Sequence, residues 1–124
     1  AADPSAAIGK VTEEIWQKNN VVDRIKDNIV SKAETVNKVR MYVMMKQAEA
    51  GIVWKANYFE SKDKLNLITI PEDKNIIKKI SMGILNFSKD KQIAKIFTDF
   101  VLNDESKAVF KKYGYNINLE QVRP

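Results

Sequence analysis

The sequence predicts an α/β domain, in which helices alternate with short apolar segments that have the composition of strands. Two observations lead to this prediction. Apolar residues recur at helical spacing in several stretches, and short runs of β-branched residues bounded by turn-forming residues lie between them. The 124 residues suffice for one compact domain with its own core.

The first half of the chain is expected to hold three helices. One should span about residues 6–17, after the loop Asp3-Pro4-Ser5, because its apolar residues share one helical face: Ile8, Val11, Ile15 and Trp16. Asn19-Asn20 ends it, and a short helix with Val21, Val22 and Ile25 directed inward should follow. A helix over about 35–48 carries Val36, Val39 and Val43 on one face.

Three segments have the pattern of buried strands, namely 51–54, 65–70 and 76–85. The second is followed by Pro71-Glu72-Asp73, a sequence that favours a turn. Helices and strands alternating in this way are expected to form a sheet flanked by helices.

The clearest helix is expected over 89–102, since its apolar residues form the stripe of a helix that lies on a sheet: Ile93, Ile96, Phe97, Phe100 and Val101. A last helix should begin at Asp104-Glu105 and end near Lys111-Lys112. Gly114 provides a left-handed residue to stop it. Residues 115–124 are expected to be irregular.

The composition argues against most enzymes. The chain has no cysteine and no histidine, which removes disulfides, thiol nucleophiles, zinc–thiolate sites and the commonest general base. Glu13 and Glu14 are adjacent and so point to different sides of a helix, which prevents them from acting as a catalytic pair. We therefore expect a protein that is not an enzyme and needs neither a metal nor another cofactor.

Two surface features have both a functional and a structural interpretation. The net charge is +5, and six lysines between positions 74 and 95 could form a basic face for nucleic acid, but interspersed acidic residues favour an ordinary solvated surface. A nucleic-acid-binding module is kept as a weak alternative. The methionines 41, 44 and 45 are expected to fill gaps in the core.

The stretch DPSAAIGK leads from a loop into a helix with small residues in its first turn. The uncovered N–H groups of such a helix start attract anions, although most helix starts bind only water or their own cap.

Four segments in order, DPSAAIGKVTEEIW, AETVNKVRMYVMMKQAEAGIVW, IPEDKN and FTDFVLNDESKAVFKKYGYNI, resemble the second half of the molybdate/tungstate-binding receptors of ABC transporters. The resemblance implies a class II periplasmic-binding-protein-like lobe, with residues 1–124 forming the second lobe and C-terminal helices and the first lobe absent. It also implies an extracytoplasmic protein, periplasmic or lipid-anchored, that passes its anion to an ABC transporter permease. A chain lacking one lobe would bind weakly, and self-association through the uncovered surface is expected.

The resemblance also implies which residues bind the oxyanion by hydrogen bonds: Ser5, Ile8, Gly9, Val36 and Trp54. The family commonly has tyrosine where this chain has Trp54, and Pro-Ala-Gly where it has Ala7-Ile8-Gly9. An indole donates one hydrogen bond but accepts none, so the change affects which oxyanion is bound more than whether one is bound. There are two alternatives to a molybdate/tungstate receptor. One is a receptor for phosphate, sulfate or a small carboxylate, and the other is the ligand-sensing domain of a transcription regulator.

Overall fold

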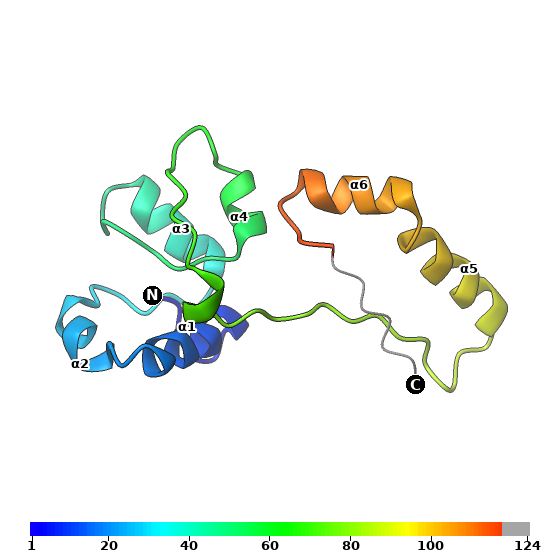
Figure 1. Cartoon of the computed structure of the whole chain (residues 1–124), viewed down its shortest axis with the longest axis horizontal. Coiled ribbons are helices and arrows are strands. Elements are labelled where there is room, and N and C mark those ends of the chain that lie inside the picture. Colours follow the sequence, from blue (N-terminus) through cyan, green and yellow to red (C-terminus); the bar gives the residue numbers. More distant parts are fainter. Residues whose placement is uncertain (118–124) are drawn as a thin grey trace. The chain divides into compact units, whose positions relative to one another are not determined.

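The computed structural model describes residues 1–117, which form helices joined by irregular segments (Figure 1). The chain divides into two units, unit 1 from Ala1 to Lys78 and unit 2 from Lys79 onward. Two of the elements, η1 and η2, are 3₁₀ turns. The elements of unit 1 are α1 (Ala7–Lys18), α2 (Val22–Ile25), η1 (Lys26–Asn28), α3 (Val36–Met44), α4 (Lys55–Phe59) and η2 (Glu72–Lys74), and those of unit 2 are α5 (Lys91–Val101) and α6 (Asp104–Lys112).

The predicted sheet is absent from the described residues, so the α/β fold class, with a sheet flanked by helices in a periplasmic-binding-protein-like lobe, is wrong for this structure. Residues 51–54, 65–70 and 76–85 form no ladder, and the only strand-type pairing in residues 1–117 is one parallel bridge between Ala2 and Ala33. A strand needs a partner for its backbone groups, and β-branched composition alone does not supply one.

The helix predictions are confirmed with small changes of length, except that Val22 of α2, expected to be directed inward, is exposed. α1 buries the predicted face, with Ile8, Val11 and Ile15 almost inaccessible and Trp16 half-buried. α3 is shorter than expected and ends at Met44. Gly114 follows α6 with a φ of 85°, the left-handed conformation that the sequence predicted.

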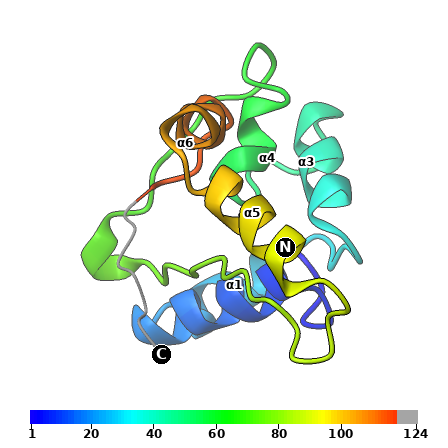
Figure 2. The same ribbon diagram turned by 90° about the vertical axis from the view of Figure 1, so that its right-hand side faces the viewer.

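The core of unit 1 lies where α1 on one side meets α3 and α4 on the other (Figures 1 and 2). Its centre is a cluster of four buried residues, Ala2, Ile8, Ala33 and Val39. The methionines expected in the core are instead on the surface, since Met41 and Met45 are exposed and Met44 is only half-buried.

Polar contacts hold the segment after η2 against the C-terminal end of α1. The Lys18 ammonium donates to the Asn75 carbonyl oxygen at 2.8 Å, and the Asn19 amide donates to the Lys74 carbonyl oxygen at 2.8 Å. An ion pair between Lys78 and Glu14, also 2.8 Å long, adds to them. These contacts fix an otherwise irregular segment on unit 1.

Unit 2 consists of α5 and α6, joined by a short turn (Figure 1). Both helices are capped by side chains: Asp90 accepts from the Ile93 N–H, and Asn103 accepts from the Ser106 N–H. Among residues 79–117 only Gly114 is buried, so the apolar stripe of α5 does not lie on a sheet as predicted but is exposed.

Candidate functional site

The residues that precede α1 and α3 are held side by side. The Asp3 N–H donates to the Ala33 carbonyl oxygen at 2.7 Å, and the Ala33 N–H donates to the Ala1 carbonyl oxygen at 2.9 Å. This is the parallel bridge between Ala2 and Ala33. Because α1 begins at Ala7 and α3 at Val36, the bridge brings the N-terminal ends of the two longer helices of unit 1 to one place.

Gly9 is required for this arrangement. A Cβ atom added to Gly9 would lie 1.9 Å from the Asp3 carbonyl oxygen and 3.0 Å from that of Ala2. The backbone before α1 therefore folds back directly onto the first turn of the helix, which only glycine permits. The Gly9 N–H donates to the Ala6 carbonyl oxygen at 2.9 Å, so it is already occupied and is not a free donor for a ligand.

A third segment, 51–54, crosses α3 and enters α4. A Cβ atom at Gly51 would lie 2.6 Å from the Val39 side chain and 3.3 Å from that of Val43, so the backbone touches the helix here. Trp54 is the N-cap residue of α4 and has an extended backbone. The segment predicted as a strand is thus a connection that places Trp54 beside the core.

Three of the five predicted ligand residues meet at the same buried cluster. Ile8 belongs to the cluster itself, and Val36 and Trp54 pack against it, half-buried. Their grouping comes from packing between elements far apart in sequence. No finding tests whether these residues bind a ligand, and that role stays a prediction.

Two of these residues have backbone N–H groups without a protein acceptor in the described part of the chain, which suits a ligand that accepts hydrogen bonds. Within residues 1–117 the backbone N–H groups of Ile8 and Val36 donate to no protein acceptor, and the Ala6 N-cap of α1 makes no side-chain capping bond. α3 is capped once, by the Thr35 hydroxyl, which accepts from the Lys38 N–H at 3.2 Å. Free N–H groups and the positive end of the helix dipole favour an anion.

The indole of Trp54 offers a further donor. In the described part of the chain its Nε1 makes no hydrogen bond and is not fully buried. The body of the half-buried ring packs against the core while its N–H stays available.

Ser5 is hydrogen-bonded to Asp3 in the turn before α1. Its backbone N–H donates to the Asp3 carboxylate at 2.8 Å. Hydrogen bonds from the side chain and backbone of Ser5 hold the pKa of Asp3 below its ordinary value. Asp3 and Ser5 thus form a local turn ahead of α1, and Ser5 is exposed.

The charge next to α3 is largely compensated. Glu34, two residues before the helix, pairs with Lys38 at 2.5 Å, and this hydrogen bond and charge lower the pKa of Glu34 and raise that of Lys38. Both side chains are exposed, so the pair is a weak constraint. It compensates the charge of Glu34, while the Asp3 carboxylate is near enough for its negative charge to act on Glu34 as well.

Sequence reasoning missed Arg40, which joins α3 to α4. Its guanidinium donates to the Asn57 carbonyl oxygen at 3.1 Å and pairs with the Glu60 carboxylate. The Arg40 side chain is mostly buried, and its Nε has no partner in the described part of the structure. The spacing from position 40 to position 60 carries no local signal, so only the fold reveals this link.

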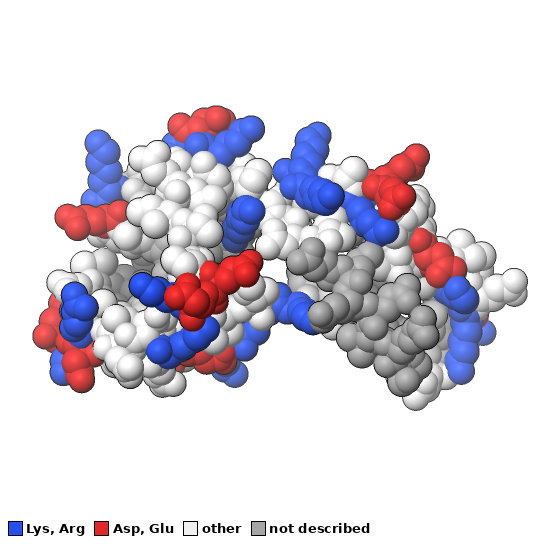
Figure 3. Space-filling model, viewed as in Figure 1, with Lys and Arg blue, Asp and Glu red and all other residues white. Residues whose placement is uncertain are grey.

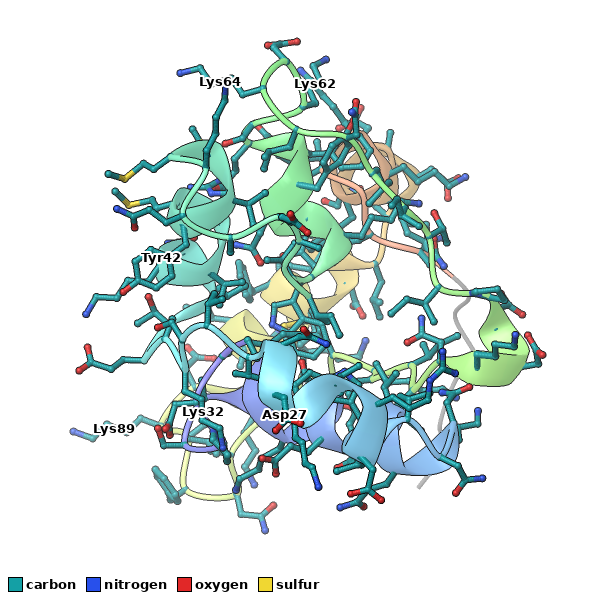
Figure 4. All side chains as sticks on the ribbon, turned by 90° about the vertical axis from the view of Figure 1, so that its left-hand side faces the viewer. Asp27, Lys32, Tyr42, Lys62, Lys64 and Lys89 are labelled. Atoms are coloured by element: carbon teal, nitrogen blue, oxygen red, sulfur yellow. The ribbon has the colours of Figure 1, made fainter. Side chains whose placement is uncertain are left out.

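Two open surface hollows of unit 1 lie away from these residues. The larger, about 350 Å³, is lined by Gln17, Asn20, Val22 and Asp23, and the smaller, about 250 Å³, by Val30, Ser31, Tyr42 and Gln47. Figure 4 shows Tyr42 on α3, and Lys62 and Lys64 projecting from the loop after α4. Neither hollow is lined by Ile8, Val36 or Trp54.

The charged residues form a mixed surface. On the face drawn in Figure 3, Lys and Arg side chains alternate with Asp and Glu over unit 1. No group of three or more acidic side chains among residues 1–117 is arranged to hold a metal ion. In the same residues, no helix is both long and apolar enough to span a bilayer.

Comparison with known proteins decides the family. The sequence profile of bacterial extracellular solute-binding proteins matches residues 1–116. The chain belongs to this family. No solved structure gave a significant match.

Two curated relatives support the assignment. The chain is 33% identical over 113 residues to a Bacillus subtilis (strain 168) protein named "Putative ABC transporter substrate-binding lipoprotein YvgL". It is 26% identical over 109 residues to a Haemophilus influenzae (strain ATCC 51907 / DSM 11121 / KW20 / Rd) protein named "Putative binding protein". These matches cover 90% and 88% of this chain but only 42% and 44% of the relatives, so the chain spans less than half of their length.

Proposed function

We propose that this chain is part of the extracytoplasmic solute-binding component of an ABC transporter, and that its ligand is molybdate, tungstate or a similar tetrahedral oxyanion. Membership of the solute-binding family supports the first statement, together with the relative whose name assigns it to an ABC transporter. The resemblance of four segments to molybdate/tungstate receptors supports the second. The partners of the complete protein are then the oxyanion and a transporter permease, outside the cytoplasmic membrane.

The main support for the proposal is that three hydrogen-bond donors, from Ile8, Val36 and Trp54, belong to residues of one cluster. The starts of α1 and α3 are joined by the bridge between Ala2 and Ala33, and the N–H groups of Ile8 and Val36 have no partner in residues 1–117. The Trp54 indole packs on the same cluster with its N–H open to solvent. Neutral donors around an anion need neither a metal nor an acid–base pair, which fits binding without catalysis.

The chain would provide only part of the binding site. We propose, from the resemblance, that residues 1–124 represent the second lobe and C-terminal helices of a two-lobed receptor. A donor that is exposed to solvent, such as the Trp54 indole N–H, binds water in competition with the anion, and hydrogen bonds to a charged group gain strength when water is excluded. We therefore expect an affinity in the millimolar range for this chain alone, about 4 kcal/mol of binding free energy.

The test is a titration of the ¹⁵N-labelled chain with sodium molybdate, followed by amide and indole NMR signals. Tungstate, sulfate and phosphate are titrated in parallel, and sodium chloride at matched ionic strength corrects for screening. Shifts at Ile8, Val36 and the Trp54 indole that saturate with molybdate or tungstate are expected. Saturation with sulfate or phosphate alone would assign the site to another oxyanion, and shifts confined to exposed lysines would contradict the proposal.

A further inference from the structure

The position of Trp54 depends on how α4 is held. α4 has only 5 residues, and a helix of that length is not stable by itself in water, so contacts with other elements must fix it. Its neighbour is α3, which lies beside it in both views (Figures 1 and 2). Trp54 is the N-cap residue of α4, and within residues 1–117 no hydrogen bond of its own holds the indole. The place of the indole relative to α3 therefore follows from the link between the two helices.

Arg40 makes this link from the middle of α3. Its guanidinium donates to the Asn57 carbonyl oxygen at 3.1 Å and pairs with the carboxylate of Glu60, the C-cap residue of α4. The Asn57 N–H in turn donates to the Trp54 carbonyl oxygen at 2.9 Å. Two consecutive hydrogen bonds thus lead from Arg40 to the backbone of Trp54.

A second candidate donor, the Val36 N–H, lies on the same helix as Arg40. The two residues are about one helical turn apart, and α3 is continuous between them. The Asn57 side-chain amide also lies 3.5 Å from the side-chain oxygen of Asn37, the residue after Val36, so α4 meets α3 at this turn. A link at Arg40 therefore fixes α4, and Trp54 with it, relative to the Val36 N–H.

The burial of Arg40 lowers its value for stability alone. The side chain is only 16% exposed, and its Nε has no partner in the described part of the chain. Burying a charge and leaving an N–H group unpaired both oppose folding. A methionine would pack between the helices without these costs, but its flexible side chain forms no directed contact. What Arg40 adds is a defined placement of α4.

We propose that Arg40 is a positioning residue of the candidate anion site, which holds the Trp54 indole in a fixed place relative to the Val36 N–H. The inference rests on the proposed function, because positioning serves binding only where an anion is bound. A donor that is already held in place loses little freedom when the anion binds, whereas a mobile donor loses more and adds less affinity. Arg40 therefore strengthens the contribution of Trp54 without touching the anion.

The first test compares the free ¹⁵N-labelled chain in wild type and Arg40→Met. The chain has two indole signals, from Trp16 and Trp54, and Trp16→Phe assigns them. We expect a lower ¹H–¹⁵N nuclear Overhauser effect at the Trp54 indole in Arg40→Met, because the ring gains mobility. Lys38→Met is the matched control, since it removes the same charge from α3 and breaks an exposed ion pair with Glu34, and it should leave the Trp54 indole as in wild type. Circular dichroism checks that both variants keep their helices.

The second test adds sodium molybdate to the same samples. In Arg40→Met the Trp54 indole shift at saturation is expected to fall to about half its wild-type size or less, and the affinity about threefold, while the Ile8 and Val36 amide shifts keep their size. Equal losses at all three donors would overturn the inference, because they would show that Arg40 acts only on the stability of the fold.

Two further outcomes separate this inference from the proposed function. A wild type that binds molybdate, together with an Arg40→Met indole that is as rigid and as responsive as in wild type, would overturn the role of Arg40 alone. A wild type without saturable shifts would contradict the anion site itself, and the inference with it.

Discussion

Gly9 shows how one residue determines where the candidate donors lie. The backbone of Ala2 and Asp3 passes so close to the first turn of α1 that no side chain fits between them. The same backbone pairs with Ala33 and so positions the start of α3. A glycine that looked like a ligand residue in the sequence therefore acts by allowing two helix starts to meet.

Replacing Gly9 by alanine is expected to destabilise unit 1 by about 1–3 kcal/mol or more, because the new methyl group meets a backbone carbonyl that cannot move aside alone. Urea unfolding followed by tryptophan fluorescence measures this, since both tryptophans, Trp16 and Trp54, lie in unit 1. Gly83→Ala is the matched control, as a Cβ atom there meets nothing within 4 Å. Equal stability of the two variants would contradict the close approach at Gly9.

Asp3 is expected to make the stability of unit 1 depend on pH in the acid range. Hydrogen bonds from Ser5 lower the pKa of Asp3 from its ordinary value of 3.8. A carboxyl group whose pKa is lower in the folded state stabilises the fold above its unfolded pKa, and this contribution is lost as pH falls through the folded pKa. Urea unfolding of wild type and Asp3→Asn should therefore differ at pH 6 and converge below pH 3; a constant difference would contradict the assignment.

At the scale of the element, α3 depends on a cap that also orders its N-terminal end. Thr35→Ala removes the hydroxyl that accepts from the Lys38 N–H and is expected to cost about 1 kcal/mol of unfolding free energy. Thr35→Ser keeps the hydroxyl and should cost clearly less. Urea unfolding of the two variants side by side measures the difference, and similar losses for both would show that the cap contributes nothing.

The sequence predicted the helices well because their signals are local. Each signal acts within a few residues. The apolar spacing of Ile8, Val11 and Ile15 predicted α1, and the acidic start and the following Gly114 predicted the two ends of α6; the structure confirms these helices. α4 was missed because Trp54 was interpreted as the end of a strand, whereas it is the N-cap of a short helix.

The strands were predicted wrongly because pairing is not a local property. Residues 51–54, 65–70 and 76–85 have the composition of strands, but the ladder that would make them strands needs a partner segment, and residues 1–117 provide none. The same limit applies to the site. Ile8, Val36 and Trp54 were found through a resemblance, while Arg40, which ties α3 to α4, gave no signal in the sequence.

At the scale of the whole molecule, the two units differ in what stabilises them. Unit 1 buries a cluster around Ile8 and Val39, whereas unit 2 buries no residue but Gly114 among 79–117. Burial of apolar surface is the main source of stability, so we expect unit 1 to be the more stable of the two and the helices of unit 2 to open more readily.

Hydrogen exchange measured by NMR tests this difference. The amides of α1 should exchange slowly and those of α5 more rapidly. Strong protection of α5 in dilute wild type would contradict the view that unit 2 lacks a core of its own.

The most direct test of the account compares molybdate binding by Val36→Pro and Val36→Ala. Proline at the first position of α3 removes the Val36 N–H while fitting the helix, and the extended backbone of Thr35 (φ −137°, ψ 153°) is compatible with a following proline. Alanine keeps the N–H and loses only the side chain. We predict that Val36→Pro weakens binding about tenfold or more while Val36→Ala stays near wild type, as expected for one lost hydrogen bond to a charged ligand. Equal affinity of the two variants would show that the N-terminal end of α3 does not hold the anion.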